Sequence, residues 1–460
     1  MSTPDAVVAR LREELVDRRL TAGLPAAFLA GASRFGSPPE PERAALAAAA
    51  GSLAARLEAG TVTGDDEPLL VRVLYFAGHH DVLAALGVRA PAYDVRGGFR
   101  EHITGPPGPR LASRPVVAGR RWPLLGRTIG FPIGVPACVL TGGEEWVRYL
   151  GGNGFNVLSY KTVRSRAHEP NARPNWVYAA RETASLPPGA AGEVTADPWD
   201  WVPPGSPAVS TVNSFGVPSL PPEEWTADLA RALAVLGEDQ LMLVSVMGDD
   251  YDSPTPQLDA LVADFARTAQ LAEEAGAPVV ELNLSCPNSL SRSASGVKPP
   301  LCLDPEATLA VVAGVRRALD DRTGLVAKLS WLDEDALATL VPRLAPLVDG
   351  IAGINTLQSR VRRSDGQATF PGRDLAGLSG VAVRDSALDF TRRLVALRDA
   401  GSARFDVLAM GGVTDPASFQ ALYDLGADAV QTASGAFSDP FLAGACAAEL
   451  GDTLARAVAA

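Results

Sequence analysis

From about residue 131 the chain alternates short apolar runs with amphipathic segments, and this alternation limits the fold more than any other feature of the sequence. Most runs are followed by a segment with helical spacing, a pattern typical of parallel strands joined by crossover helices. Strands are expected at residues 132–137, 156–161, 241–247, 279–284, 325–329, 351–355, 406–411 and 429–433. Helices are expected at 143–151, 257–275, 305–319, 333–344, 384–399 and 416–425, with one more at 222–236 inside the long insert 162–240.

Eight strands with helical spacers predict an α/β fold, a (β/α)8 TIM barrel, over residues 131–460. A doubly wound open sheet is the alternative. Residues 1–95 are rich in Ala, Leu, Arg and Glu, with helical spacing around 6–16, 43–58 and 68–86, and they predict an additional N-terminal helical domain. Residues 96–130 carry GG, PPGP and further glycines around short apolar runs, which is typical of a connector with a hairpin.

Composition limits the partners and the compartment. A net charge of -12 without clusters of Lys and Arg argues against nucleic acid as a partner. The N-terminus is charged from Asp5 onward and no segment offers about 18 uninterrupted apolar residues, so we expect a cytoplasmic protein with no membrane partner. The cysteines, Cys138, Cys286, Cys302 and Cys446, form no CxxC pair. We therefore expect no metal site and an organic redox centre, if there is one.

Polar residues end several of the apolar runs, and in a barrel the carboxyl ends of the strands are where active residues lie. The ends in question are Tyr160-Lys161-Thr162, Asn283-Leu284-Ser285-Cys286-Pro287-Asn288, Lys328, Asn355-Thr356 and Gly411-Gly412. Capping and turn formation would explain one or two of them. A lysine that closes an apolar strand also needs a partner, because burying an unpaired charge is costly. Together these ends predict one binding site.

The last two strand ends predict a phosphate site. A helix is expected shortly after Gly411-Gly412, and Ala433-Ser434 end the eighth run. Glycine lets backbone amides approach an anion, and the first turn of a helix offers free N–H donors. The segment Gly377-Leu378-Ser379-Gly380 is a third candidate contributor, with a flexible loop as the alternative.

The motif VVELNLSCPNS, residues 279–289, carries the most chemistry. The carboxamides of Asn283 and Asn288 both donate and accept hydrogen bonds, which suits an amide-rich planar ligand. Cys286 lies between them, and an ordinary thiol pKa of about 8.5 leaves enough thiolate at neutral pH for a positioned general base. Cys138 and Cys446 are expected to be small buried hydrophobic residues.

At this motif the chain resembles a known family, because ELNLSCPN is similar to the signature of the dihydroorotate dehydrogenases, especially their soluble branch with a cysteine base. Other segments resemble the same family. They are Tyr160-Lys161-Thr162 as its flavin-contacting lysine segment, Asn171-Ala172-Arg173-Pro174 as its Asn-x-x-Pro stretch, TVNSFGVPS with Asn213 as its substrate loop, Lys328 as its lysine near the flavin N1 and O2 edge, and Asn355-Thr356 as a substrate-binding pair. The resemblance covers residues 98–440.

The resemblance implies an FMN-dependent oxidoreductase that oxidises a small pyrimidine-like substrate, dihydroorotate, to orotate. Cys286 would remove a proton from the carbon next to the one that gives its hydride to flavin N5. The resemblance implies that the substrate is held by Asn213, Asn283, Asn288, Asn355 and Thr356. It implies that FMN is held by Ala137, Lys161, Thr162, Lys328, Gly380, Gly411, Gly412, Ala433 and Ser434.

Three features depart from the family pattern. Cys138 follows Ala137 where Ser or Gly is more usual, and Ala433 stands where the phosphate loop usually has Gly. Residues 289–303 form a loop after the base that is compatible with a lid and with a different substrate. That loop carries Cys302, and related dihydropyrimidine dehydrogenases have their acid–base cysteine on the corresponding loop. Cys302 is therefore a second candidate base.

Other functions and partners stay open. The same residues would serve a reaction on another dihydropyrimidine or cyclic amide, and a barrel without catalysis would act as a flavin-binding scaffold. The electron acceptor leaves no mark in the sequence. The N-terminal helices are longer and more charged than the membrane-docking pair of quinone-linked relatives, which disfavours quinone coupling at a membrane. They are compatible with covering the barrel, with a homodimer, or with docking an electron-transfer partner.

Overall fold

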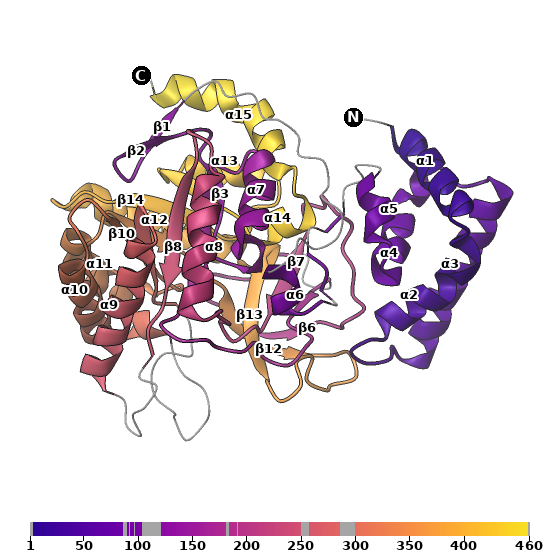
Figure 1. Ribbon diagram of the computed structural model, residues 1–460, viewed down its shortest axis with the longest axis horizontal. Helices are drawn as coiled ribbons and strands as arrows, with labels where there is room; N and C mark the ends of the chain where they lie inside the picture. The colour runs from indigo at the N-terminus through magenta and orange to yellow at the C-terminus, as the bar shows by residue number, and fades with distance from the viewer. Residues whose placement is uncertain are drawn as a thin grey trace.

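A computed structural model gives the architecture of the protein (Figure 1). It describes residues 3–85, 90–91, 93–95, 97–103, 121–180, 184–190, 192–249, 257–285 and 300–458. The predicted base Cys286 and the predicted substrate ligand Asn288 lie outside the described residues, as does most of the predicted lid.

Eight parallel strands close into a barrel in the order β3-β4-β8-β9-β10-β11-β14-β15. Their bounds are β3 (Ile133–Val135), β4 (Val157–Val163), β8 (Leu241–Val246), β9 (Val279–Asn283), β10 (Gly324–Lys328), β11 (Gly350–Gly353), β14 (Asp406–Met410) and β15 (Ala429–Gln431). The barrel closes where Val430 of β15 pairs with Ile133 of β3. These strands match the eight predicted runs, so the predicted TIM barrel is confirmed and the open sheet is wrong.

Helices follow most of the barrel strands and pack around them (Figure 1). They are α7 (Glu144–Gly152), α8 (Pro222–Ala234), α9 (Leu258–Glu274), α10 (Pro305–Ala318), α11 (Glu334–Leu344), α12 (Arg384–Ala400), α13 (Pro416–Tyr423), α14 (Ser434–Ser438) and α15 (Leu442–Val458). The N-cap residues of α10, α11 and α13 are Asp304, Asp333 and Asp415, and each carboxylate accepts a backbone N–H of the first turn. Such caps satisfy donors that the helix itself leaves open.

A second sheet of five strands was not predicted. Its order is β5-β7-β13-β12-β6, with β12 and β6 parallel and the other pairs antiparallel. The bounds are β5 (Trp176–Tyr178), β6 (Glu193–Thr195), β7 (Ser210–Asn213), β12 (Leu357–Arg362) and β13 (Leu375–Gly380). β5, β6 and β7 come from the insert after β4, and β12 and β13 come from the segment after β11. Both segments therefore leave the barrel at its carboxyl end, where the sheet lies.

The N-terminal helices form a group beside the barrel, drawn in indigo in Figure 1. They are α1 (Pro4–Asp17), α2 (Leu24–Ala32), α3 (Glu40–Ala59), α4 (Glu67–Ala77) and α5 (His80–Ala85), and they share a buried apolar cluster. The single helical segment expected at 68–86 is divided, because Gly78 ends α4 in a left-handed conformation with φ 86°. No helix in the described ranges is both long and apolar enough to cross a membrane.

The connector between these helices and the barrel contains a short helix, α6 (Phe99–Ile103), and a hairpin of β1 (Trp122–Leu124) and β2 (Arg127–Ile129). α6 lies against the turn that follows β3, where Ile103 approaches Gly142 and Gly143. The indole N–H of Trp146 on α7 donates to the carbonyl of His102 on α6 at 3.0 Å. The connector thus packs on the first βα unit of the barrel.

Candidate active site

A cavity of about 1030 Å³ opens at the carboxyl end of the barrel. Residues at or just after the end of every barrel strand except β14 line it, and β5, β7 and β13 of the second sheet supply the opposite wall. The predicted site residues that line this cavity are Ala137, Lys161, Thr162, Asn213, Asn283, Lys328, Asn355, Thr356 and Ala433. The barrel therefore brings together residues that are up to about 300 positions apart in the sequence.

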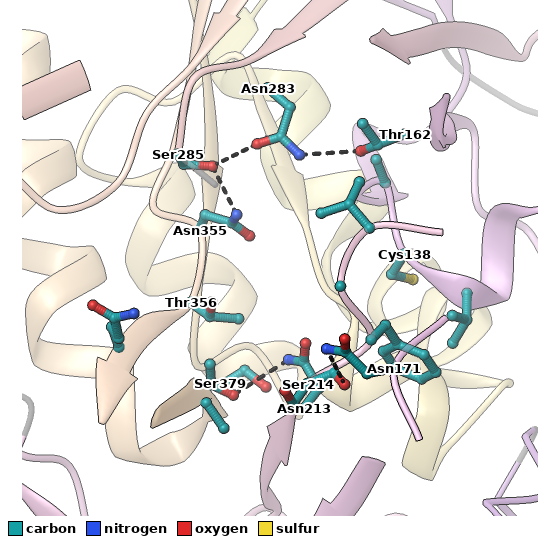
Figure 2. A pocket seen from close by; sticks show the side chains of 18 of the residues that line it. Cys138, Thr162, Asn171, Asn213, Ser214, Asn283, Ser285, Asn355, Thr356 and Ser379 are labelled. Atoms are coloured by element: carbon teal, nitrogen blue, oxygen red, sulfur yellow. Dashed lines mark hydrogen bonds between the residues drawn. The ribbon is translucent and has the colours of Figure 1, made fainter. Parts of the chain in front are cut away.

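A chain of hydrogen bonds orients the carboxamides on one wall (Figure 2). The Asn283 amide donates to Thr162 Oγ1 at 3.1 Å and its oxygen accepts from Ser285 Oγ at 2.9 Å. The Asn355 amide then donates to Ser285 Oγ at 2.7 Å. Asn213 faces them from β7, where its amide donates to the carbonyl of Gly377 at 3.3 Å. The wall thus presents fixed amide groups, and Ser285 joins two of them.

Two lysines bring positive charge to the cavity. Lys161 lies where β4 shifts its register against β8, and its Nζ donates to the carbonyls of Thr162 and Pro218 at 3.2 and 3.3 Å. Lys328 ends β10 and is 1% exposed. Its Nζ is 3.7 Å from Glu281 Oε1, a carboxylate that is also fully buried. Neither lysine is a solvated surface charge.

Three predicted phosphate-site glycines and Ser434 lie outside the described lining of the cavity. A Cβ on Gly412 would lie 2.5 Å from Arg384 Cβ, and one on Gly380 would lie 2.3 Å from the carbonyl oxygen of Val209. A Cβ on Gly411 would similarly lie 2.8 Å from the Cβ of Ala387 in the first turn of α12. Close backbone packing therefore accounts for these glycines in the described structure.

The segment 377–380 is part of β13, so its interpretation as a flexible loop is wrong. Gly377 and Ser379 of this strand line the cavity. The hydroxyls of Ser379, Thr211 and Ser434 form a triangle with separations of 2.9 to 3.0 Å. This cluster joins the second sheet to the first residue of α14, the short helix after β15.

The described cysteines differ in their access to the cavity. Cys138 lines it, although burial raises the pKa of its thiol to about 11. Cys302 is 2% exposed and does not line it, and its Sγ accepts the backbone N–H of Ser330 at 3.5 Å. Burial raises the pKa of the Cys302 thiol to about 12. Cys446 is buried, as expected, whereas Cys138 is only partly buried, since it packs against the core and also lines the cavity.

Several charged residues and one histidine at the cavity were missed by the sequence analysis. They include Arg164, His168, Asp249, Arg373 and Asp374. Arg164 follows the end of β4 directly, so its place after Lys161-Thr162 was a usable signal. Asp249 lies a few residues beyond β8, and Arg373 and Asp374 lie in the segment that leads into β13, so none of them ends an apolar run in the sequence.

Comparison with known proteins places these features in a family. A family model described as dihydroorotate dehydrogenase matches residues 206–454, which is more than half of the chain. The chain belongs to the dihydroorotate dehydrogenase family. The predicted resemblance is therefore confirmed, and the protein is an oxidoreductase that acts on a CH–CH bond.

Individual members of the dihydroorotate dehydrogenase family are similar over different lengths. A protein of Dictyostelium discoideum named dihydroorotate dehydrogenase is 27% identical over 372 residues, which cover 77% of this chain and 96% of that protein. A putative dihydroorotate dehydrogenase A (fumarate) of Aeropyrum pernix is 32% identical over 36% of this chain and 51% of its own length. The catalytic subunit of a dihydroorotate dehydrogenase B (NAD(+)) of Geobacter sulfurreducens is 29% identical over 41% of this chain and 57% of its own length.

Proposed function

We propose that the protein oxidises dihydroorotate to orotate with FMN bound in the cavity. The observation that carries the proposal is the pairing of a carboxamide wall, Asn283 and Asn355, with the buried ammonium of Lys328 in one cavity at the carboxyl end of the barrel. Membership of the dihydroorotate dehydrogenase family supports it.

The surroundings of Lys328 fit a flavin. Its carboxylate neighbour Glu281 is 3.7 Å away, which is longer than a hydrogen bond, while the ammonium is almost fully buried. A buried charge needs hydrogen-bonding partners, and the electron-rich N1 and O2 edge of FMN would provide one. The cavity of about 1030 Å³ is also of the size expected for a cofactor site.

We propose that FMN is held by the residues that the family pattern indicates, with its phosphate toward the loops after β14 and β15. These residues are Ala137, Lys161, Thr162, Lys328, Gly380, Gly411, Gly412, Ala433 and Ser434. Bound FMN would supply the electron acceptor for the hydride, chemistry that no side chain provides. Lys161 and Lys328 would hold positive charge beside it.

The substrate ring would be held by Asn213, Asn283, Asn288, Asn355 and Thr356. Carboxamides both donate and accept, so they match the alternating N–H and C=O groups of a dihydropyrimidine. The hydrogen bond that the Asn283 amide donates to Thr162 and the one that its oxygen accepts from Ser285 fix which way this carboxamide faces, which favours one orientation of the ring. The neighbouring polar groups therefore support recognition of a cyclic imide.

Cys286 would remove the proton from the substrate carbon. Its neighbours Asn283 and Ser285 line the cavity, which supports a position at the reacting ring. Cys302 suits this task less, because its sulfur accepts a hydrogen bond from the backbone and lies outside the described lining of the cavity. Burial also raises the pKa of its thiol to about 12. A base needs access to the substrate and a pKa nearer to neutral pH.

Anaerobic addition of dihydroorotate to the purified yellow protein tests the proposal. We expect rapid loss of the flavin absorbance band, with orotate formed in an amount equal to the flavin reduced. A yellow protein that does not bleach would retain the cofactor but assign the reaction to another dihydropyrimidine or cyclic amide. A colourless protein that binds no added FMN would contradict the proposed cofactor and favour a scaffold.

A further inference from the structure

The loop after β7, residues 213–218, has an unusual backbone. Gly216 and Val217 follow one another with φ angles of 79° and 51°. The left-handed region is costly for a residue with a branched Cβ, by roughly 1–2 kcal/mol. Such a conformation persists only where surrounding contacts hold it. The loop lines the cavity from Asn213 to Val217, so those contacts determine the shape of the cavity wall.

Arg164 provides the contacts for the two left-handed residues. Its Nε donates to the carbonyl of Val217 at 3.0 Å and its Nη2 donates to the carbonyl of Gly216 at 3.4 Å. Its Nη1 pairs with Asp249 Oδ2 at 3.1 Å, and the side chain is 1% exposed. The planar guanidinium thus spans two successive carbonyls while the carboxylate balances its charge.

The neighbouring carbonyls of the loop are held in the same way. The backbone N–H and the side-chain amide of Asn171 donate to the carbonyls of Phe215 and Ser214 at 2.9 and 3.2 Å. Figure 2 shows the Asn171 side chain directed at Ser214. Lys161 Nζ donates to the carbonyl of Pro218 at 3.3 Å. Every carbonyl from residue 214 to residue 218 therefore has a donor from the scaffold.

The backbone N–H groups of the loop are available to a ligand in the cavity. Within the described residues, no acceptor takes the N–H groups of Phe215, Gly216 and Val217. All three residues line the cavity and are partly exposed. Their direction depends on the carbonyls that Arg164 and Asn171 hold, because the C=O of one residue and the N–H of the next lie in one peptide plane and turn together. Loss of the Arg164 contacts would change which donors face a substrate.

We propose that Arg164 is a positioning residue for substrate binding. It holds Gly216 and Val217 in the left-handed region, so that Asn213 and the loop amides keep the direction that the substrate requires. The inference rests on the proposed function, since it assigns the residue to binding of the same substrate. It concerns the loop, and it gives Arg164 no part in proton or hydride transfer.

The variant Arg164→Lys tests this role, because it keeps the charge and the pairing with Asp249 but cannot span two carbonyls. We expect the dihydroorotate concentration that half-saturates anaerobic flavin reduction to rise roughly tenfold or more, the effect of losing hydrogen bonds from a charged donor. Flavin content and the limiting rate of reduction should stay within about threefold of wild type. Arg148→Lys is the matched control, because Arg148 pairs with Glu144 on the surface of α7 away from the loop.

Hydrogen–deuterium exchange of the peptide 211–220 is a second test of the contacts of Arg164, and it needs no substrate. Ser214 and Ser219 donate to the carbonyls of Asn175 and His168 on either side of the loop. Their exchange should be about tenfold faster in Arg164→Lys and unchanged in Arg148→Lys. Unchanged exchange, or an unchanged half-saturating concentration in a protein that bleaches, would overturn the inference. If the proposed function is wrong, dihydroorotate will not bleach the wild-type protein. The hydrogen–deuterium exchange of the loop would still decide whether Arg164 holds it.

Discussion

The burial of individual side chains shows which polar residues belong to the candidate site, a distinction that the sequence alone makes only in part. Asn283, Lys328 and Asn355 were predictable, because each lies at the end of an apolar run and such residues meet at one end of a barrel. Arg164 was only partly predictable: its place after Lys161-Thr162 was a signal, but an arginine after a strand resembles an ordinary surface cation until its burial is known. Ser285 belongs to the predicted motif, but only the structure shows that it joins Asn283 to Asn355.

Substitution of each candidate base, Cys286 and Cys302, tests which of them removes the proton from the substrate. Cys286→Ala should keep its flavin and lose turnover by roughly 10²-fold or more, the scale expected when a general base is lost. Cys302→Ala should keep turnover within about threefold and lower the free energy of unfolding by about 1 kcal/mol, because it removes a small buried side chain. Steady-state rates and thermal unfolding measure both. An active Cys286→Ala beside an inactive Cys302→Ala would reverse the assignment.

Among the elements, the barrel strands were predictable and the second sheet was not. The barrel strands are buried on both faces and read as continuous apolar runs, which a sequence shows directly. β5 and β6 have three residues each and β7 has four, too few to establish a period. The pairing of β7 with β13 and of β6 with β12 joins segments about 165 residues apart, so no local pattern indicates it. The insert was consequently expected to hold only the helix now seen as α8.

The contact between the loop after β14 and α12 leads to a prediction about these two elements. Gly412 has φ 74°, and an added Cβ would lie 2.5 Å from Arg384 Cβ and 2.7 Å from its Cα. Gly412→Ala should therefore force α12 away from the loop. We expect the free energy of unfolding to fall by roughly 2–4 kcal/mol, from the left-handed backbone and the overlap together, and the affinity for FMN to fall with it.

Gly366→Ala is the control for this change. Gly366 has a similar φ of 80°, but nothing lies within 4 Å of its Cβ position. It should lose only about 1 kcal/mol, the cost of the backbone conformation alone. Urea denaturation of both variants measures the difference. Equal losses would mean that α12 yields easily and that its packing does not set the shape of the loop.

On the scale of the whole molecule, the N-terminal helices are tied to the insert that builds the second sheet. The rings of Tyr75 and Phe76 on α4 lie 5.2 and 5.7 Å from the ring of Trp201. Arg72 donates to the carbonyl of Trp199 at 2.9 Å, and Tyr75 Oη donates to the carbonyl of Tyr93 at 2.8 Å. These pairs include residues more than 120 positions apart, which explains why the sequence left the place of the helices open.

Two partly buried carboxyl groups at the end of the barrel away from the cavity make stability depend on pH. Asp406 and Asp428 lie at the amino ends of β14 and β15. Burial raises the pKa of Asp428 to about 6 and also raises that of Asp406, from an ordinary value of 3.8. The folded protein therefore keeps a proton on Asp428 at a pH where the unfolded chain has lost it. The stability contributed by this group is complete below pH 4 and is lost as the pH rises through about 6.

Asp428→Asn should remove this dependence, because an amide does not titrate and its oxygen can still accept the N–H of Val407. As the pH rises from 4 to 7, the difference in the free energy of unfolding between the variant and wild type should shift by about 1 to 2 kcal/mol in favour of the variant. This allows for the partial exposure of the carboxylate and for its pairing with Arg398. The control is Asp424→Asn, which removes the carboxylate of an exposed residue four positions before Asp428 and should leave the loss of stability between pH 4 and pH 6 in place. Parallel curves for wild type and Asp428→Asn in urea would instead show that Arg398 keeps Asp428 ionised throughout.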